Sequence, residues 1–141
     1  MAVIRLYQPA DEAPLFDLVR AFPAPTPPDH AAFAAALSAK LADAASYLAV
    51  AEHDGALVGY IAGYCHPTFY AGGYTAWVDE VLVIAPLRKR GVGRLLMEAF
   101  EAWAVSRACT QVSLATRNAG QFYERLGYAT NAGYFKKYLR G

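Results

Sequence analysis

A short basic turn with two glycines joins a predicted strand to a predicted helix, and this junction constrains the fold more than any other segment. The turn reads Arg88-Lys89-Arg90-Gly91-Val92-Gly93-Arg94. The preceding residues 77–84 are apolar apart from Asp79 and Glu80, which is typical of a buried strand. The following residues have the apolar spacing of one helical face, at Val92, Leu95, Leu96, Ala99, Phe100 and Trp103. The junction therefore predicts a strand and a helix that meet at the basic turn.

The start of this helix has the properties of an anion site. The first amides of a helix have no partner inside the helix, and the helix dipole favours negative charge there. Gly91 and Gly93 allow the backbone to approach a ligand closely, and the four cations of the turn suit phosphate. A P-loop is excluded because G-x-x-x-x-G-K-[ST] is absent, and a dinucleotide fingerprint is excluded because Leu96 stands where its third glycine is needed. The turn therefore predicts a ligand that carries a pyrophosphate.

The rest of the chain predicts alternating strands and helices in one α/β domain over residues 1–141. Strands are expected at 3–7, 46–52, 56–66, 75–84 and 111–116, with further β structure at Tyr128 and at 134–139. Helices are expected after Asp11 and Asp29, which are predicted to cap them, after the basic turn, and over 120–126. Residues 67–74 are predicted to form a loop, and Asp54-Gly55 a tight hairpin. The order β-α-α-β-β-β-α-β-α-β includes a meander within the α/β pattern.

A second motif follows downstream, Phe122-Tyr123-Glu124-Arg125-Leu126-Gly127-Tyr128. Glycine is the residue type that best ends a helix in the left-handed conformation, and residues four apart on a helix lie on one face. Phe122 and Leu126 should therefore pack inward, while Tyr123 lies on the neighbouring face. Arg88-x-x-Gly91-x-Gly93 and this segment together resemble the [RQ]-x-x-G-x-[GA] and F-Y-x-x-x-G-[FY] motifs of the GNAT family of N-acetyltransferases. The resemblance covers about residues 75–137.

The resemblance implies a GNAT-like fold, with a mixed, strongly twisted central sheet and helices on both faces. It implies that strands 75–84 and 111–116 splay apart and that coenzyme A enters the notch between them. Acetyl-CoA would be the co-substrate, and a primary amine of a small molecule or a peptide the acceptor. The backbone amides of Val81, Leu82 and Val83 would then pair with the pantetheine arm, and the backbone groups of residues 88–94 would take the pyrophosphate.

Acetyl transfer to an amine needs a group that removes the amine proton and a group that protonates the leaving thiolate. The resemblance assigns Tyr123 as the general acid, which suits a weakly acidic hydroxyl that keeps its proton at neutral pH. Glu80 is the candidate base, acting directly or through water, and the alternative is a carboxylate that only binds a cationic acceptor. Asp79 and Glu80 are expected to point to opposite faces of their strand unless a bulge intervenes.

Two departures from the family pattern affect the cofactor side. Family members often have proline three residues before the motif arginine, where this chain has Ala85 followed by Pro86. Many members also carry an asparagine that binds the pantetheine arm, and Thr116 occupies that position here. Asn118, two residues later, is the candidate replacement.

Aromatic residues are candidates for the acceptor pocket, although most of them are expected to serve packing. Tyr70 and Tyr74, in the predicted loop 67–74, are the preferred candidates together with Glu80. The sequence does not identify the acceptor amine. Two other functions stay open, namely a catalytically inactive coenzyme A-binding module with a sensory or structural role, and a nucleotide-binding domain that uses the same glycine turn.

The composition restricts the partners and the compartment. The formal net charge is +1, which argues against nucleic acid or an anionic membrane as the main partner. Cys65 and Cys109 have no metal-ligand spacing, so we expect free thiols and no metal. Residues 1–6 lack the pattern of a signal peptide, and no apolar run approaches membrane-spanning length, so a cytoplasmic location is expected. A homodimer is left open.

Overall fold

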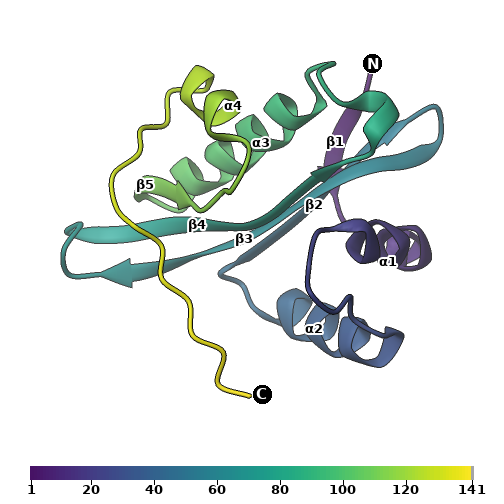
Figure 1. Ribbon diagram of the computed structural model, residues 1–141, viewed down its shortest axis with the longest axis horizontal. Helices are drawn as coiled ribbons and strands as arrows, with labels where there is room; N and C mark the ends of the chain where they lie inside the picture. Colours follow the sequence, from purple (N-terminus) through teal and green to yellow (C-terminus); the bar gives the residue numbers. More distant parts are fainter. Residues whose placement is uncertain (141) are drawn as a thin grey trace.

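One mixed sheet runs through the molecule, and helices cover both of its faces (Figure 1). The computed structural model describes residues 1–140. The strands are β1 (Val3–Leu6), β2 (Ser46–His53), β3 (Ala56–Thr68), β4 (Gly73–Val83) and β5 (Cys109–Leu114). They are ordered β1-β2-β3-β4-β5, and every neighbouring pair is antiparallel except the parallel pair β4–β5. The prediction of an α/β fold with a mixed sheet is confirmed.

The helices lie in two layers on opposite faces of this sheet. They are α1 (Glu12–Ala21), α2 (His30–Ala42), α3 (Val92–Ser106) and α4 (Gly120–Arg125), with short 3-10 turns η1 (Pro9–Asp11) and η2 (Ala85–Leu87). Helices α1 and α2 lie on one side of the sheet, whereas α3 and α4 lie on the other (Figure 1). Helices are therefore found on both faces, as expected.

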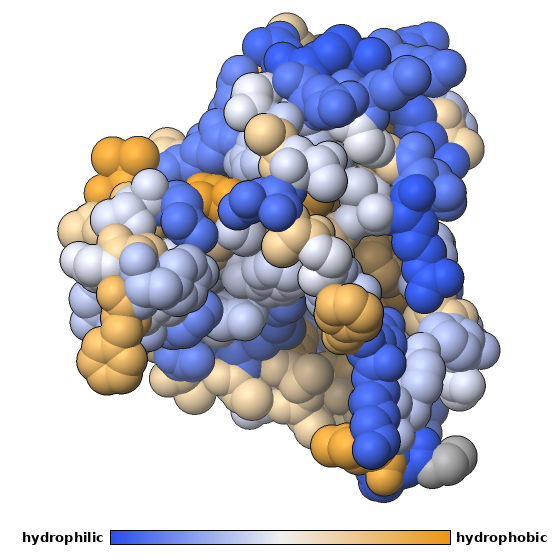
Figure 2. All heavy atoms as spheres, turned by 60° about the vertical axis from the view of Figure 1, so that its left-hand side comes forward, coloured by the Kyte–Doolittle hydropathy of each residue, from blue (hydrophilic) through white to orange (hydrophobic). Residues whose placement is uncertain are grey.

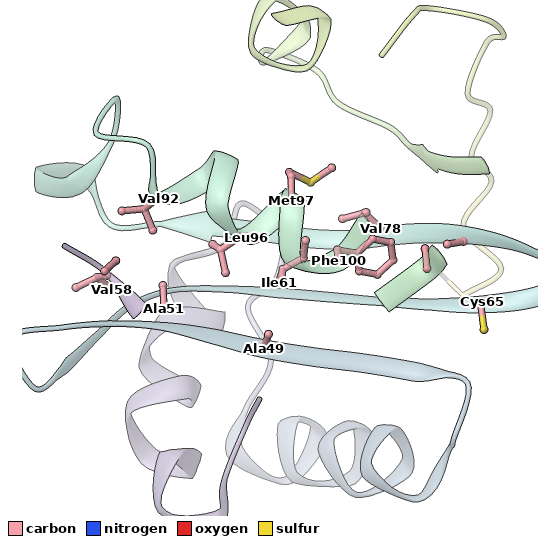
Figure 3. Packing of buried hydrophobic residues seen from close by; sticks show 13 residues of the cluster. Ala49, Ala51, Val58, Ile61, Cys65, Val78, Val92, Leu96, Met97 and Phe100 are labelled. Atoms are coloured by element: carbon pink, nitrogen blue, oxygen red, sulfur yellow. The ribbon is translucent and has the colours of Figure 1, made fainter. Parts of the chain in front are cut away.

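The α3 face of the sheet holds the larger core (Figure 3). Leu96 and Phe100, which belong to the helical face predicted from the sequence spacing, are fully buried at 0% exposure. Met97, which that spacing did not include, is buried with them. They pack against small and branched side chains of the strands, among them Ala49, Ala51, Ile61, Ala76 and Val78. Burying one such large side chain stabilises the fold by about 1.5–3 kcal/mol. This packing holds the start of α3 in a fixed position beside β4.

The opposite face forms a second core beneath α1 and α2. Alternation along β2 sends Val50 to this face while its neighbours Ala49 and Ala51 face α3. Tyr60 of β3 and Leu82 of β4 lie beside Val50 in the same cluster. The helices contribute four buried side chains, Leu15, Leu18, Phe33 and Leu37.

Four local predictions were wrong. Tyr128, where β structure was expected, lies in no strand. Residues 67–74 are not one loop, because β3 continues to Thr68 and β4 begins at Gly73, so that only 69–72 form the turn. Residues 134–139 form no strand, and the pattern Y-F-K-K-Y-L indeed lacks the two-residue alternation of a strand with one buried face. Asp11 makes no side-chain cap on α1. It accepts instead from the guanidinium of Arg5 at 2.8 and 2.9 Å and from the amide of Gln8 at 2.8 Å.

The C-terminal segment after α4 crosses from the α3 side of the sheet to the α2 side (Figure 1). The ring of Tyr134 stacks on Trp77 of β4, with centroids 6.3 Å apart and an interplanar angle of 17°. Other hydrophobic side chains of this segment and of the β3–β4 turn project from a largely hydrophilic surface (Figure 2); those exposed by more than half are Phe69, Tyr70, Tyr134, Phe135, Tyr138 and Leu139.

Candidate functional site

The second half of β4 has a strand partner on one side only. β5 pairs with β4 between Tyr74 and Val78, and then β5 ends at Leu114. Residues 79–83 of β4 continue along β3 but have no partner on the β5 side. Backbone N–H and C=O groups are obligatory hydrogen-bonding groups, so an open strand edge is a place where an extended ligand can pair. The open edge arises because β5 ends at Leu114, and the splaying of the two strands that the resemblance implies stays a prediction.

Alternation of the backbone decides which residues face this open edge. The amide of Ile84 donates to the carbonyl of Val58 on β3 at 2.9 Å. Groups two residues apart point the same way, so the backbone of Leu82 also faces β3. Its carbonyl oxygen indeed lies only 2.6 Å from the position that a Cβ on Gly59 would take. The open edge is therefore formed by Val81 and Val83, and the predicted contact through the amide of Leu82 is corrected.

One cation of the basic turn already contacts this edge. The Nε of Arg88 donates to the carbonyl oxygen of Val83 at 3.0 Å, and the Arg88 side chain is exposed. The turn is thereby tied to the end of β4. Because a guanidinium has further donors, Arg88 can hold the edge and still offer N–H groups to an anion.

The basic turn ends in a helix start with free amides. Gly91 is the N-cap residue of α3 with φ +87°, and Lys89 also has a positive φ of 62°. The first helical hydrogen bond runs from the amide of Leu95 to the carbonyl of Gly91 at 3.0 Å. The amides of Val92, Gly93 and Arg94 precede it and have no helical acceptor, and no side chain caps Gly91 within residues 1–140. Free amides at a helix start are the arrangement that an anion site needs, and anion binding here stays a prediction.

The side chains around this helix start carry positive charge. Lys89 and Arg90 are exposed, and Arg94 is exposed while pairing with Glu98 one turn later at 3.2 Å. Exposed charges of this kind attract an anion from solution but are screened by salt. The free amides therefore provide fixed hydrogen-bond donors, and the cations provide a positive electrostatic potential around them.

The two glycines of the turn serve different purposes. A Cβ on Gly91 would meet nothing within 4 Å, so the space above it is open to a ligand. A Cβ on Gly93 would lie 3.2 Å from Cζ of Phe122 in α4. Gly93 therefore lets α4 pack closely on the start of α3, a role that the sequence analysis did not assign. This contact joins the two sequence motifs in space.

Helix α4 presents Tyr123 beside the same region. Its end is a Schellman motif, in which Gly127 has φ +95° and the amide of Tyr128 donates to the carbonyl of Tyr123 at 3.0 Å. The Tyr123 ring is half-buried, and its centroid lies 4.9 Å from that of Phe122 and 6.0 Å from that of Tyr128. Burial raises the pKa of the Tyr123 hydroxyl above its usual value of 10, so this hydroxyl is a proton donor over the neutral range.

The loop before α4 contains the two residues considered for the missing asparagine. The Oγ1 of Thr116 accepts a hydrogen bond from the amide of Ala119 at 3.2 Å and so supports the entry to α4. Asn118 is exposed beside it. Its role as a cofactor contact stays a prediction.

A β-bulge places both carboxylates of β4 on the α2 side of the sheet. Ala62 pairs with Glu80 and Gly63 pairs with Val78, which leaves Asp79 as the extra residue. Val78 lies in the α3-side core, whereas Glu80 contacts Tyr60 on the other face. The bulge that was allowed as an exception to the alternation of Asp79 and Glu80 is therefore present. A Cβ on Gly63, across from the bulge, would lie 2.5 Å from the Phe100 ring. A glycine inside a strand often marks a bulge, so Gly63 was the feature of the sequence that could have predicted this one.

Asp79 and Glu80 have different partners. Asp79 pairs with Lys40 of α2 at 3.7 Å, and burial, together with Glu80, raises the pKa of Asp79 above its usual range although Lys40 opposes this. Glu80 accepts through Oε1 from the hydroxyl of Tyr60 at 2.7 Å. A pocket of about 70 Å³ opens beside these groups between the helices and the sheet. Its lining is mostly apolar and includes Leu15, Phe33, Ala36, Leu37, Lys40, Tyr60 and Glu80.

The aromatic residues chosen for the acceptor pocket are not brought to Glu80. Tyr74 is the second residue of β4, so it lies about 20 Å along the strand from Glu80. Tyr70 is in the turn beyond it, with its hydroxyl 3.4 Å from Nε2 of Gln111. Trp77, on whose ring Tyr134 stacks, is on the α2 side of β4 only two residues before Asp79. Trp77 is therefore the aromatic residue of β4 nearest to the two carboxylates.

Two searches of the described residues 1–140 bear on cofactors and membranes. No three His, Cys, Asp or Glu side chains come together there as a metal site would require. None of the helices in this part of the chain has the length and apolar character needed to cross a membrane.

Comparison with known proteins finds a family model that covers most of the chain and relatives that match parts of it. Residues 6–128 match the model of the acetyltransferase (GNAT) family. N-alpha-acetyltransferase 80 of Mus musculus is 47% identical over 51 residues, which are 36% of this chain and 16% of that protein. An uncharacterised N-acetyltransferase of Chlorobaculum tepidum is 34% identical over 70 residues, which are 50% of this chain and 44% of that protein. The chain thus spans less than half the length of these curated relatives.

Solved structures agree with the fold over almost the entire chain. Glucosamine-6-phosphate N-acetyltransferase from Arabidopsis thaliana superposes with a TM-score of 0.87 at 17% sequence identity. The superposition covers 99% of this chain and 99% of that structure. At this identity the likeness is one of fold.

Proposed function

The chain belongs to the GNAT acetyltransferase family, and from this membership we propose that it transfers an acetyl group from acetyl-CoA to a primary amine of a small molecule or a peptide. One observation carries the proposal. The open edge of β4, at Val81 and Val83, runs toward a helix start with free amides at Val92 to Arg94, and Arg88 connects the two. An extended arm that ends in a pyrophosphate needs this combination.

The residues present fit acetyl-CoA, which when bound supplies the acetyl group as a thioester. The amides of Val92, Gly93 and Arg94 hold the pyrophosphate, and the exposed Lys89 and Arg90 add positive charge. The backbone groups of Val81 and Val83 pair with the pantetheine arm. One of these amides donates to the thioester carbonyl and stabilises the oxyanion that forms there. Asn118 contributes a side-chain contact to the same arm.

Glu80 and Tyr123 perform the proton transfers. Glu80 accepts a proton from the neutral amine, directly or through water, as the nitrogen forms its bond to the acetyl carbon. The carbon–sulfur bond then breaks, and Tyr123 donates its proton to the sulfur. The products are an N-acetylated amine and a free thiol, and the proton on Glu80 returns to Tyr123 through solvent. The hydroxyl enters the reaction protonated, because burial raises the pKa of Tyr123 above its usual value.

The deciding experiment measures binding and turnover separately. Isothermal titration with acetyl-CoA is followed by thiol release on a broad panel of amines, with Glu80→Gln and Tyr123→Phe as comparison variants. We expect acetyl-CoA binding by all three proteins and thiol release that falls in both variants. Binding without thiol release for any amine would favour an inactive coenzyme A-binding module. Tighter binding of ATP or NAD than of coenzyme A would favour a nucleotide-binding domain.

We also propose a cytoplasmic location, which the two unpaired thiols of Cys65 and Cys109 support. The proposed partners are acetyl-CoA and the amine, with neither nucleic acid nor a membrane surface among them, and the net charge of +1 supports this. A homodimer is compatible with the exposed side chains of the C-terminal segment. Size-exclusion chromatography with light scattering would decide the oligomeric state.

A further inference from the structure

Tyr60 contacts the proposed base from the core of the protein. Its side chain is 1% exposed, in the cluster that α1 and α2 cover, and its hydroxyl donates to Oε1 of Glu80 at 2.7 Å. Tyr60 pairs with Leu82 across β3 and β4, so it lies diagonal to Glu80 on one face of the sheet. A buried hydroxyl needs a partner, and Glu80 provides it.

Within residues 1–140, Glu80 forms no ion pair with a cation. Lys40, which lines the same pocket as Glu80, is paired through Nζ with Asp79 at 3.7 Å. Among residues 1–140, the Tyr60 hydroxyl is the one side-chain hydrogen-bond partner of the Glu80 carboxylate. Glu80 is therefore held by a neutral hydroxyl and not by a cation. This hydrogen bond occupies Oε1, whereas Oε2 has no side-chain hydrogen-bond partner within residues 1–140.

We propose that Tyr60 is the positioning residue of the acetyl-transfer site, holding Glu80 through Oε1 so that Oε2 receives the amine proton. This inference rests on the proposed function. Glutamate has three side-chain torsions, and a glutamate at the surface samples several rotamers. The hydrogen bond to a fully packed tyrosine selects one of them.

The test compares Tyr60→Phe with the wild type in thiol release, and makes the same change in the Glu80→Gln variant. We expect kcat to fall about tenfold or more in the wild-type background, the size expected for a hydrogen bond to a charged group. In the Glu80→Gln background the change should cause no comparable further fall, because Tyr60 acts through Glu80. The KM for acetyl-CoA should stay unchanged, because Tyr60 lies on the face opposite α3 and α4.

Tyr47→Phe is the matched control. Tyr47 is a partly buried tyrosine on the neighbouring strand β2, where it packs against Phe100 and Trp103 on the α3 face. Its hydroxyl makes no side-chain hydrogen bond in the described part of the chain. Removing that hydroxyl should leave kcat unchanged. A general effect of losing a tyrosine hydroxyl from the sheet would instead appear in both variants.

The outcomes separate the inference from the proposed function. Absence of thiol release from the wild type with every amine would overturn both. An active wild type, an inactive Glu80→Gln variant and an unchanged kcat in Tyr60→Phe would overturn the inference alone. Thermal unfolding gives a second measurement if Tyr60→Phe is destabilised. The losses in Tm caused by Tyr60→Phe and Glu80→Gln should not add in the double variant, and additive losses would show that the two residues are not coupled.

Discussion

Replacing Gly93 with valine should disturb the packing of α4 on α3, and this effect can be sized from the structure. A Cβ at this position would lie 3.2 Å from Cζ and 3.6 Å from Cε1 of Phe122. Valine adds two further methyl groups at the same place, so the Phe122 ring has to move. Overpacking of this kind costs about 1–3 kcal/mol of the free energy of unfolding. The better helix propensity of valine offsets only a few tenths of a kcal/mol.

The expected loss corresponds to a decrease in Tm of roughly 3–10 °C for a domain of this size. It would be measured by circular dichroism during thermal and urea unfolding. Phe122→Leu removes the far edge of the ring, so the double variant Gly93→Val/Phe122→Leu should be more stable than the sum of the single effects predicts. Acetyl-CoA affinity and turnover should recover with it, because Tyr123 follows Phe122 in α4.

Gly91→Val is the matched control for this experiment. Its φ of +87° makes a β-branched residue strained, at a cost of about 1–2 kcal/mol, but a Cβ there would meet nothing within 4 Å. Phe122→Leu should therefore not rescue Gly91→Val. Equal rescue of both glycine variants, or no rescue of Gly93→Val, would refute the assignment of Gly93 to helix packing.

Three further predictions concern single residues. Tyr123→Phe should lower kcat by roughly 10²–10⁴-fold with nearly unchanged acetyl-CoA affinity. Wild-type activity should persist until the pH rises through the raised pKa of this tyrosine, above its usual value of 10. Full activity of the Phe variant would show that Tyr123 is not the general acid. Arg88→Ala should weaken acetyl-CoA binding by roughly two- to fivefold and flatten its salt dependence. The effect should be small because the exposed guanidinium beside the Val83 carbonyl is screened by salt. An unchanged salt slope in isothermal titration would exclude contact between Arg88 and the ligand. Asp11→Asn should reduce stability at neutral pH but have little effect in strong acid. Arg5 holds the pKa of Asp11 below its usual 3.8, so this stabilisation is present above about pH 4 and is lost as the pH falls through the lowered value. Urea unfolding at several pH values would measure this, and a loss of stability that is the same at every pH would contradict the prediction.

The cofactor side of the site could be predicted from the sequence because its determinants are local. The helix face of α3, the basic turn before it and the glycine that ends α4 each occupy consecutive residues. Helical periodicity and the conformational preference of glycine act within such segments, whatever the rest of the chain does. The features missed there are relations between segments, namely the contact of Gly93 with Phe122 and the turning of Leu82 toward β3.

The strand boundaries were less predictable for a physical reason. Residues 67–74 contain proline, two glycines and three aromatic residues, a composition that favours a loop. Pairing between β3 and β4 nevertheless extends to Thr68 and Gly73, because two long antiparallel strands gain hydrogen bonds with each added pair. At the other end of the chain, aromatic content suggested β structure at 134–139, but a strand needs a partner edge and an alternating pattern as well as suitable residues.

The acceptor side depends on register, which no short motif specifies. One extra residue at Asp79 changes which side chains of β4 face α2, since a shift of one residue reverses the face of every following side chain. The bulge sits opposite Gly63, and Phe100 fills the space that a side chain on Gly63 would need. A substitution at Gly63 would thus act on the two carboxylates from the opposite face of the sheet. The orientation of the proposed base is for this reason a property of the α3-side core as much as of β4 itself.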